Sequence, residues 1–136
     1  MKRRGILNSD IAKGLSDLGH TDMIMIADCG LPIPNGVKKI DISLKPGTPT
    51  LLDVYNVLVK ELIIEKEIIA IESKANNDEF YNEFNEHTNV EELTHEKLKE
   101  LSKECKFIIR TGEITPYANV ILVSGVDFKE LSESSN

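Results

Sequence analysis

The sequence predicts an α/β protein in which a mostly parallel or mixed sheet lies between two layers of helices. Short apolar runs, typical of strands buried on both faces, alternate with segments whose apolar residues repeat at helical spacing. This alternation favours a three-layer helix-sheet-helix sandwich over a helical bundle or a β-sandwich. The length of 136 residues fits a single domain, which we expect over residues 1–128.

The first helix is expected over residues 10–18. Asn8-Ser9-Asp10 offers N-caps, and Gly19 can supply a left-handed C-cap. The apolar run Met23–Ala27 then predicts a strand that is covered on both faces. Asp28 should therefore lie at the end of a strand.

The middle of the chain continues the alternation. Val37–Ile42 predicts a second strand, and Pro46-Gly47-Thr48-Pro49 combines a turn with an N-cap and a proline at the first helical position. A broad apolar stripe extends the helix that begins there to about Leu62. Ile68–Ile71 predicts another buried strand.

The last part of the chain is more polar. A short helix is expected within Asn76–Asn89, and Thr94 can cap the helix that follows. Phe107–Arg110 and Val120–Val126 predict two further strands. The polar, terminal segment Lys129–Asn136 is expected to be a disordered tail.

Charge and hydropathy exclude several partners. A formal net charge of −7 with a pI near 5.0 offers no basic surface for nucleic acid or an anionic membrane. No apolar run approaches the roughly 18 residues of a membrane span. The cationic start Met1-Lys2-Arg3-Arg4 is followed by polar residues instead of a signal-peptide core. Cys29 and Cys105 lack CxxC spacing and predict buried free thiols, so we expect a cytoplasmic protein.

Cofactor motifs are also missing from the sequence. It contains no GxGxxG dinucleotide loop and no GxxxxGK[ST] phosphate loop. His95-Glu96 begins like a zincin helix, but Lys99 stands where the second histidine is required. These residues therefore support neither a nucleotide-binding loop nor a zinc site.

Two groups of unusual strings stand near the two ends of the chain. The first comprises Gly5–Asp10, Leu18-Gly19-His20-Thr21-Asp22 and Ala27–Pro34, and the second comprises Ile109–Glu113 with Thr115–Asn119. Together they resemble the two signatures of the D-ribose pyranase family, within the ribose pyranase and fucose mutarotase superfamily. The resemblance extends from Gly5 to about Val126. It departs from the family at Cys29, where alanine is usual, in the central residues 76–89, and in the extension beyond residue 127.

The resemblance implies a sugar-ring isomerase that interconverts the pyranose and furanose forms of D-ribose and supplies the furanose for ribose utilisation. It implies that His20 is the proton donor and that the sugar is bound by Asp28, His95, Tyr117, Ala118 and Asn119. It further implies no cofactor and a homo-oligomer, a ring-based decamer, whose site is completed between neighbouring subunits.

The chemistry of these residue types suits the implied reaction. Ring opening needs general acid–base catalysis, and an imidazole, with an ordinary pKa of about 6.5, can give and take protons near neutral pH. Asp28 could orient His20 or bind a sugar hydroxyl. Tyr117 and Asn119, two residues apart on an extended segment, would project to the same side. Taken singly, however, His20 could equally be a residue at a helix end, and His95 an exposed residue of a first helical turn.

Other polar residues receive structural roles. Asp22 is expected to be an exposed turn residue, His87 to lie on the surface, and Arg110 to pair with Glu113 beside a glycine turn. Two competing functions remain: an L-fucose-type mutarotase, which would invert the anomeric carbon, and a non-catalytic sugar-binding or transport-accessory protein.

Overall fold

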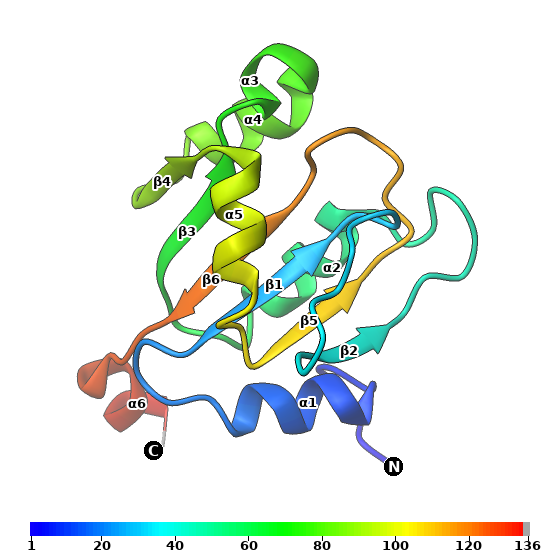
Figure 1. Cartoon of the computed structure of the whole chain (residues 1–136). Coiled ribbons are helices and arrows are strands. Elements are labelled where there is room, and N and C mark those ends of the chain that lie inside the picture. Colours follow the sequence, from blue (N-terminus) through cyan, green and yellow to red (C-terminus); the bar gives the residue numbers. More distant parts are fainter. Residues whose placement is uncertain (135–136) are drawn as a thin grey trace.

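Six strands and six helices make up the computed structural model, which describes residues 1–134 (Figure 1). The strands are β1 (Met23–Ala27), β2 (Lys38–Asp41), β3 (Ile64–Ala70), β4 (Val90–Leu93), β5 (Phe107–Arg110) and β6 (Val120–Ser124). The helices are α1 (Ser9–Ser16), α2 (Leu51–Leu58), α3 (Ser73–Asn76), α4 (Asp78–Asn85), α5 (His95–Ser102) and α6 (Phe128–Ser134). None of these helices is long and apolar enough to cross a membrane.

The strands form one mixed sheet in the order β2-β5-β1-β6-β3-β4. Strand β1 is parallel to β5, β5 to β2, and β3 to β4, whereas β6 runs antiparallel to both of its neighbours, β1 and β3. The start of β6 therefore lies beside the carboxyl ends of β1 and β3. Its end lies beside their starts.

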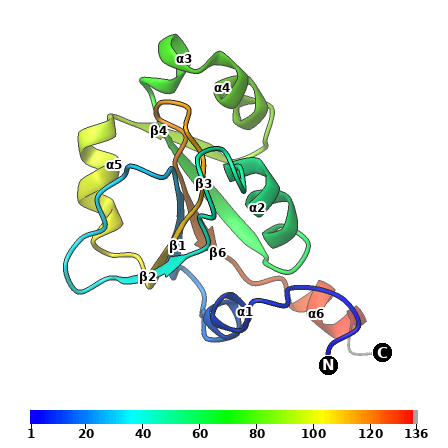
Figure 2. The ribbon, with the colours of Figure 1, turned by 90° about the vertical axis from the view of Figure 1, so that its right-hand side faces the viewer.

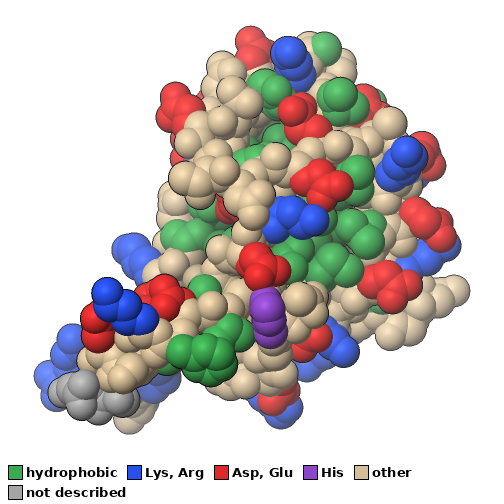
Figure 3. Space-filling model, turned by 90° about the vertical axis from the view of Figure 1, so that its left-hand side faces the viewer, with side chains coloured by type: hydrophobic (Ala, Val, Ile, Leu, Met, Phe, Trp, Pro, Cys, Tyr) green, Lys and Arg blue, Asp and Glu red, His purple; other side chains and the backbone are tan. Residues whose placement is uncertain are grey.

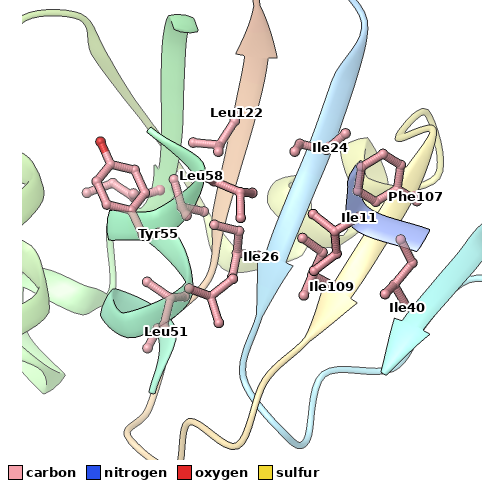
Figure 4. Close-up of a cluster of buried hydrophobic side chains, with 14 of the residues drawn as sticks. Ile11, Ile24, Ile26, Ile40, Leu51, Tyr55, Leu58, Phe107, Ile109 and Leu122 are labelled. Carbon is pink, nitrogen blue, oxygen red and sulfur yellow. The ribbon is translucent and has the colours of Figure 1, made fainter. Parts of the chain in front are cut away.

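Helices cover both faces of the sheet, as Figure 2 shows with α5 on one side and α2 on the other. Alternate residues of β1 point to the two sides: Ile24 and Ile26 join the cluster that contains α2, while Met25 and Ala27 join the one that contains α5. Figure 4 shows Ile26 beside Leu51 and Leu58 of α2, and Ile24 belongs to the same cluster. The expected three-layer architecture and double-sided burial of this strand are confirmed.

Helix α1 begins as the sequence predicts but ends differently. The Asn8 side chain accepts the Ile11 N–H at 2.9 Å, so the expected N-cap is present. The helix ends at Ser16, with Asp17 as a right-handed C-cap. The predicted left-handed C-cap at Gly19 is wrong, because the residue here with positive φ is Thr21, at 71°.

Helix α2 begins later than expected. Lys45 and Thr48 bond to each other across a tight turn, which occupies the backbone of Thr48. Thr50 is the N-cap instead and forms a capping box with Asp53. The predicted cap at Thr48 is therefore wrong by two residues, and the helix ends at Leu58 rather than Leu62.

Several elements escaped prediction or differ in extent. Strand β4 and helix α3 were not expected, because Val90–Leu93 contains two adjacent glutamates and Ser73–Asn76 is only one turn long. The segment expected to be a disordered tail begins instead with helix α6, where the Asp127 carboxylate accepts the Glu130 N–H at 3.1 Å. Residues 135 and 136 of that predicted tail lie outside the described residues.

Gly112 ties the turn before α2 to the end of β5. Its N–H donates to Pro49 O at 2.9 Å, and a Cβ added to Gly112 would lie 2.3 Å from Thr48 O and 2.6 Å from Lys45 O. We predict that Gly112→Ala destabilises the protein by about 1–3 kcal/mol, because backbone atoms must move to admit the methyl group.

Thermal unfolding checks this prediction beside the control Gly19→Ala, whose added Cβ would meet only the Asp22 carboxylate at 3.6 Å. The control should melt close to wild type. A Gly112→Ala protein that melts with the control would contradict the expected overlap.

Candidate active site

Asp28 and Asn119 form a reciprocal hydrogen-bonded pair at the carboxyl end of β1. The Asp28 N–H donates to Asn119 Oδ1 at 2.8 Å, and Asn119 Nδ2 donates to Asp28 Oδ2 at 3.0 Å. Asn119 is fully buried, whereas Asp28 is half-buried and also accepts the Gly30 N–H at 2.9 Å. Each carboxylate oxygen keeps a lone-pair position that can accept a ligand hydroxyl.

His95 and Tyr117 meet at the same edge of the sheet. Their ring centroids lie 5.1 Å apart in an edge-on arrangement. The backbone N–H of His95 donates to both Glu72 carboxylate oxygens, at 2.9 and 3.1 Å. Within residues 1–134, His95 Nδ1 is the one buried side-chain nitrogen or oxygen without a hydrogen-bond partner. Buried polar atoms are rarely left unpaired, so this nitrogen is a candidate for contact with a ligand.

Tyr117 and Ala118, just before β6, pack on opposite sides of the sheet. Ala118 packs into the cluster on the α2 side, and Tyr117 packs against the cluster on the α5 side. The φ of Tyr117 is 57° and its carbonyl accepts the Asn119 N–H at 3.0 Å, so the segment turns here and the alternation expected of an extended strand does not apply to Tyr117 and Asn119. Ala118 is buried, with 1% of its surface exposed, so its side chain contributes packing and leaves only its backbone for a ligand.

His20 lies at the opposite edge of the sheet, before the start of β1. Its Nε2 is 2.7 Å from Glu65 Oε1, and both side chains are about half exposed. The intervening strand, Met23–Ala27, is five residues long and spans about 13 Å. His20 and Asp28 are therefore separated within one chain, and the interpretation that Asp28 orients the imidazole of its own chain is wrong.

The loop that carries Asp28 has a partner that the sequence did not indicate. Arg110 donates through Nε to Cys29 O at 3.0 Å and through Nη1 to Asp41 at 2.9 Å. The expected ion pair between Arg110 and Glu113 is absent, because Glu113 instead accepts the Leu51 N–H at the start of α2. Arg110 thus links the Asp28 loop to the end of β2.

Asp22 and His87 also have structural roles predicted from the sequence, and the structure agrees for Asp22 but not for His87. Asp22 accepts the Gly19 N–H at 2.8 Å, in the turn role that was expected. His87 is half-buried rather than on the surface, because its Nδ1 pairs at 2.6 Å with Glu67, a buried carboxylate that also accepts the Tyr55 hydroxyl. Burial raises the pKa of the Tyr55 hydroxyl, and the hydrogen bond to Glu67 and the charge of that carboxylate raise it further.

Cysteines and acidic side chains offer no metal site in the described part of the chain. No group of three or more His, Cys, Asp and Glu residues there could hold a metal ion. Both cysteines are free: Cys105 is buried, which raises the pKa of its thiol to about 12, and Cys29 is half-buried.

The fold and these polar clusters define a small α/β protein with a hydrogen-bonding site suited to a neutral, hydroxyl-rich ligand. Residues 1–127 match the family described as the RbsD / FucU transport protein family, and the chain belongs to that family.

Similar proteins carry a more particular name. D-ribose pyranase of Staphylococcus saprophyticus is 57% identical over 133 residues, which cover 94% of this chain and 100% of that protein. D-ribose pyranase of Bacillus subtilis is 55% identical over 131 residues with the same coverage.

Solved structures agree with the fold. The structure of Bacillus subtilis RbsD complexed with D-ribose matches with a TM-score of 0.88 and 56% identity, covering 94% of this chain and 100% of that one. The fucose mutarotase of Streptococcus pneumoniae, in complex with L-fucose, matches with a TM-score of 0.69 but only 23% identity, over 89% of this chain and 94% of that one. This second likeness shows the shared fold alone.

Asp41, which holds Arg110, has an unusual acidity. The Ser43 hydroxyl and N–H, with a smaller contribution from Arg110, lower the pKa of Asp41 from 3.8 to about 2. A carboxyl with a depressed pKa in the folded state contributes stability above its unfolded pKa, and this contribution is lost as the pH falls through the folded one.

We predict that Ser43→Ala raises the pKa of Asp41 and moves this loss of stability to a higher pH. Carbon-13 NMR titration of the carboxyl groups, together with acid unfolding from about pH 5 to about pH 1.5, a range that brackets both pKa values, measures both effects. Ser16→Ala, an exposed serine at the end of α1, is the control. An Asp41 pKa that stays near 2 in Ser43→Ala would contradict the assigned cause.

Proposed function

We propose that the protein is a D-ribose pyranase, an isomerase that interconverts the pyranose and furanose forms of D-ribose. The observation that carries the proposal is identity above one half along the whole length of proteins with that name. The structural match to a ribose-bound relative at a TM-score of 0.88 supports it. The product would supply furanose for ribose utilisation.

The reaction is an exchange of protons around one reversible bond. An acid protonates the ring oxygen as its bond to the anomeric carbon breaks, while a base removes the proton of the anomeric hydroxyl, leaving an open-chain aldehyde. After rotation, the 4-hydroxyl attacks the aldehyde carbon and loses its proton, and the former carbonyl oxygen regains one. No proton is consumed overall, so side chains and water suffice for the chemistry.

We assign the acid to His20 and sugar binding to the opposite edge of the sheet. The Asp28 carboxylate can accept sugar hydroxyls while Asn119 holds it in place. The unpaired Nδ1 of His95, the Tyr117 hydroxyl and the backbone of Ala118 provide further contacts. Because Asp28 is remote from the His20 of its own chain, we expect it to bind the sugar.

The separation of these two edges supports a site formed between two chains. His20 stands at one edge of the sheet, and the Asp28 cluster stands at the other. A head-to-tail interface would bring the first edge of one chain against the second edge of its neighbour, and repetition of such a contact closes a ring. We therefore propose a homo-oligomer, with a ring-based decamer as its expected form.

The two cysteines bear on the cellular location. Cys29 and Cys105 are both free, which fits a reducing compartment, and we propose that the enzyme acts in the cytoplasm.

Two alternatives are less well supported. An L-fucose mutarotase shares the fold, but identity to the fucose-bound structure is 23%, against 56% to the ribose-bound one. A non-catalytic sugar-binding protein would need the Asp28 cluster but no acid, so catalysis by His20 distinguishes it.

We predict that His20→Gln lowers the rate of ribose ring exchange by about 10²–10⁴-fold while leaving the fold intact, because glutamine cannot shuttle a proton. This loss corresponds to about 3–5 kcal/mol, whereas one neutral hydrogen bond contributes only about 0.5–1.5 kcal/mol. Saturation-transfer NMR on D-ribose, with chelator-treated protein, measures the rate.

His87→Gln is the matched control, since it makes the same substitution at a histidine outside the site and keeps a donor for Glu67. A folded His20→Gln protein that keeps more than about a third of the wild-type rate would remove His20 as the acid. Absence of exchange by wild type would instead favour the binding protein.

A second prediction tests the two-chain site. His20→Gln and Asp28→Asn variants should each be weakly active, but oligomers formed from an equal mixture should regain about a quarter of wild-type activity, because one in four interfaces pairs intact residues. Unmixed variants, carried through the same dissociation and reassembly, are the controls. If the activity of the mixture never exceeds the mean activity of the two unmixed variants, the shared site is contradicted. A wild-type protein that light scattering shows to be a monomer and that is nevertheless fully active would also contradict it.

A further inference from the structure

The His20 imidazole has two distinct nitrogens in this structure. Nε2 is 2.7 Å from Glu65 Oε1, and Nδ1 makes no hydrogen bond to any of residues 1–134. The side chains are 54% and 46% exposed, and an ion pair this exposed contributes little to stability. The backbone around both residues nevertheless holds them in place, which points to a role in positioning.

Strand β3 has a β-bulge at Glu65. Ile64 pairs with Ser124 and Lys66 with Val123, so Glu65 is the extra residue of a β-bulge. Bulges re-aim side chains and are frequent beside active sites. Asn89 Nδ2 also donates to the Glu65 carbonyl at 2.6 Å and anchors the bulge from the side of β4.

Gly125 allows β3 to approach the end of β6. A Cβ added to Gly125 would lie 3.0 Å from the Glu65 Cβ and 3.2 Å from its backbone nitrogen. The Gly125 N–H donates to Ile63 O at 2.8 Å. A larger residue here would push the bulge away from His20.

The loop that carries His20 is fixed to the same end of β6. Thr21 donates to Ser124 O at 2.8 Å with a φ of 71°, a conformation that is unusual for a β-branched residue. Such local strain persists only where surrounding contacts enforce it and is concentrated at functional sites. His20 and Glu65 are thus presented to each other by the end of one strand.

His20, whose Nδ1 has no hydrogen bond to the described residues, lies at a surface cavity. His20 lines a cavity of about 630 Å³ together with Leu18, Val126 and Leu131. The other charged residues of this cavity are Lys60, Glu61 and Glu130. Figure 3 shows a surface histidine with acidic and hydrophobic side chains beside it.

We propose that Glu65 is the positioning residue of His20 and that Nδ1 is the nitrogen that exchanges protons with the sugar. This inference rests on the proposed function. As the carbon–oxygen bond breaks, the imidazolium passes its Nδ1 proton to the ring oxygen, a water molecule takes the proton of the anomeric hydroxyl, and the neutral imidazole keeps its Nε2–H on Glu65. When the sugar ring recloses, Nδ1 accepts the proton of the attacking hydroxyl, the water returns a proton to the former carbonyl oxygen, and the imidazolium is restored.

Replacement of His20 by Nδ1-methylhistidine tests the assignment at the level of one atom. The methyl group blocks Nδ1 and leaves Nε2 free to meet Glu65. The rate of ribose exchange should fall by about 10²–10⁴-fold, as far as in His20→Gln. An Nδ1-methylated enzyme that keeps more than about a third of the wild-type rate would overturn the proposal.

Glu65→Gln supplies an independent readout that does not need the methyl group. It should lower the maximal exchange rate by about tenfold or more with little change in ribose affinity, since a glutamine amide can donate to Nε2 as well as accept from it and no longer fixes the tautomer of the imidazole. At alkaline pH, where an imidazole is neutral, and without ribose, the nitrogen-15 resonances of His20 should change from one Nε2-protonated tautomer in wild type to a mixture of tautomers in Glu65→Gln. Unchanged rates and unchanged His20 resonances would overturn the role of Glu65.

Glu91→Gln is the matched control, because it breaks an exposed ion pair with Lys66, 2.8 Å long, on the neighbouring strand. Its rate and its His20 resonances should equal those of wild type. Failure of the proposed function is distinguishable from failure of this inference, since in the first case wild type itself leaves ribose exchange at the solvent rate.

Discussion

The antiparallel course of β6 between β1 and β3 organises both functional edges of the molecule. Because β6 runs against its neighbours, the segment before it meets the residue after β1, which allows Asn119 to bond Asp28. The end of β6 meets the starts of the same strands, where Ser124 accepts a hydrogen bond from the His20 loop and Gly125 donates one to Ile63, just before β3. If β6 ran parallel to β1 instead, its start would lie beside the His20 loop and its end beside Asp28. Asn119 could then not bond Asp28.

The two edges differ in how they are held. Around Asp28 the contacts are buried and reciprocal, and a fully buried amide fixes a half-buried carboxylate. Around His20 the side chains are exposed, and the backbone of the bulge and of Thr21 fixes the positions of His20 and Glu65. Tyr117, with a φ of 57°, is likewise a non-glycine residue in a left-handed conformation. Each edge therefore contains one strained residue next to or within its polar cluster, as expected where function opposes local preference.

The elements that could be predicted are those whose own residues determine them. Met23–Ala27 and Phe107–Arg110 are apolar throughout most of their length, and both strands have the predicted bounds. The errors fall where another segment supplies the deciding contact. Thr48 cannot cap α2 because its backbone bonds to Lys45, and β4 forms from a glutamate-rich segment because β3 offers it a free edge.

The sequence by itself determined the layered α/β class, the buried strands, and, through its two strings of residues, the family and the identity of the candidate site residues. It could not place Tyr117 relative to Asn119, because the expected alternation requires an extended segment and Tyr117 turns the backbone with a φ of 57°. Only the tertiary structure decided which of these residues meet. His20 and Asp28 are eight positions apart yet lie at opposite edges, because an extended strand separates them. Glu65, 45 positions from His20, is its partner because a bulge and a glycine bring the strands together, and such long-range contacts leave no periodic pattern in the sequence.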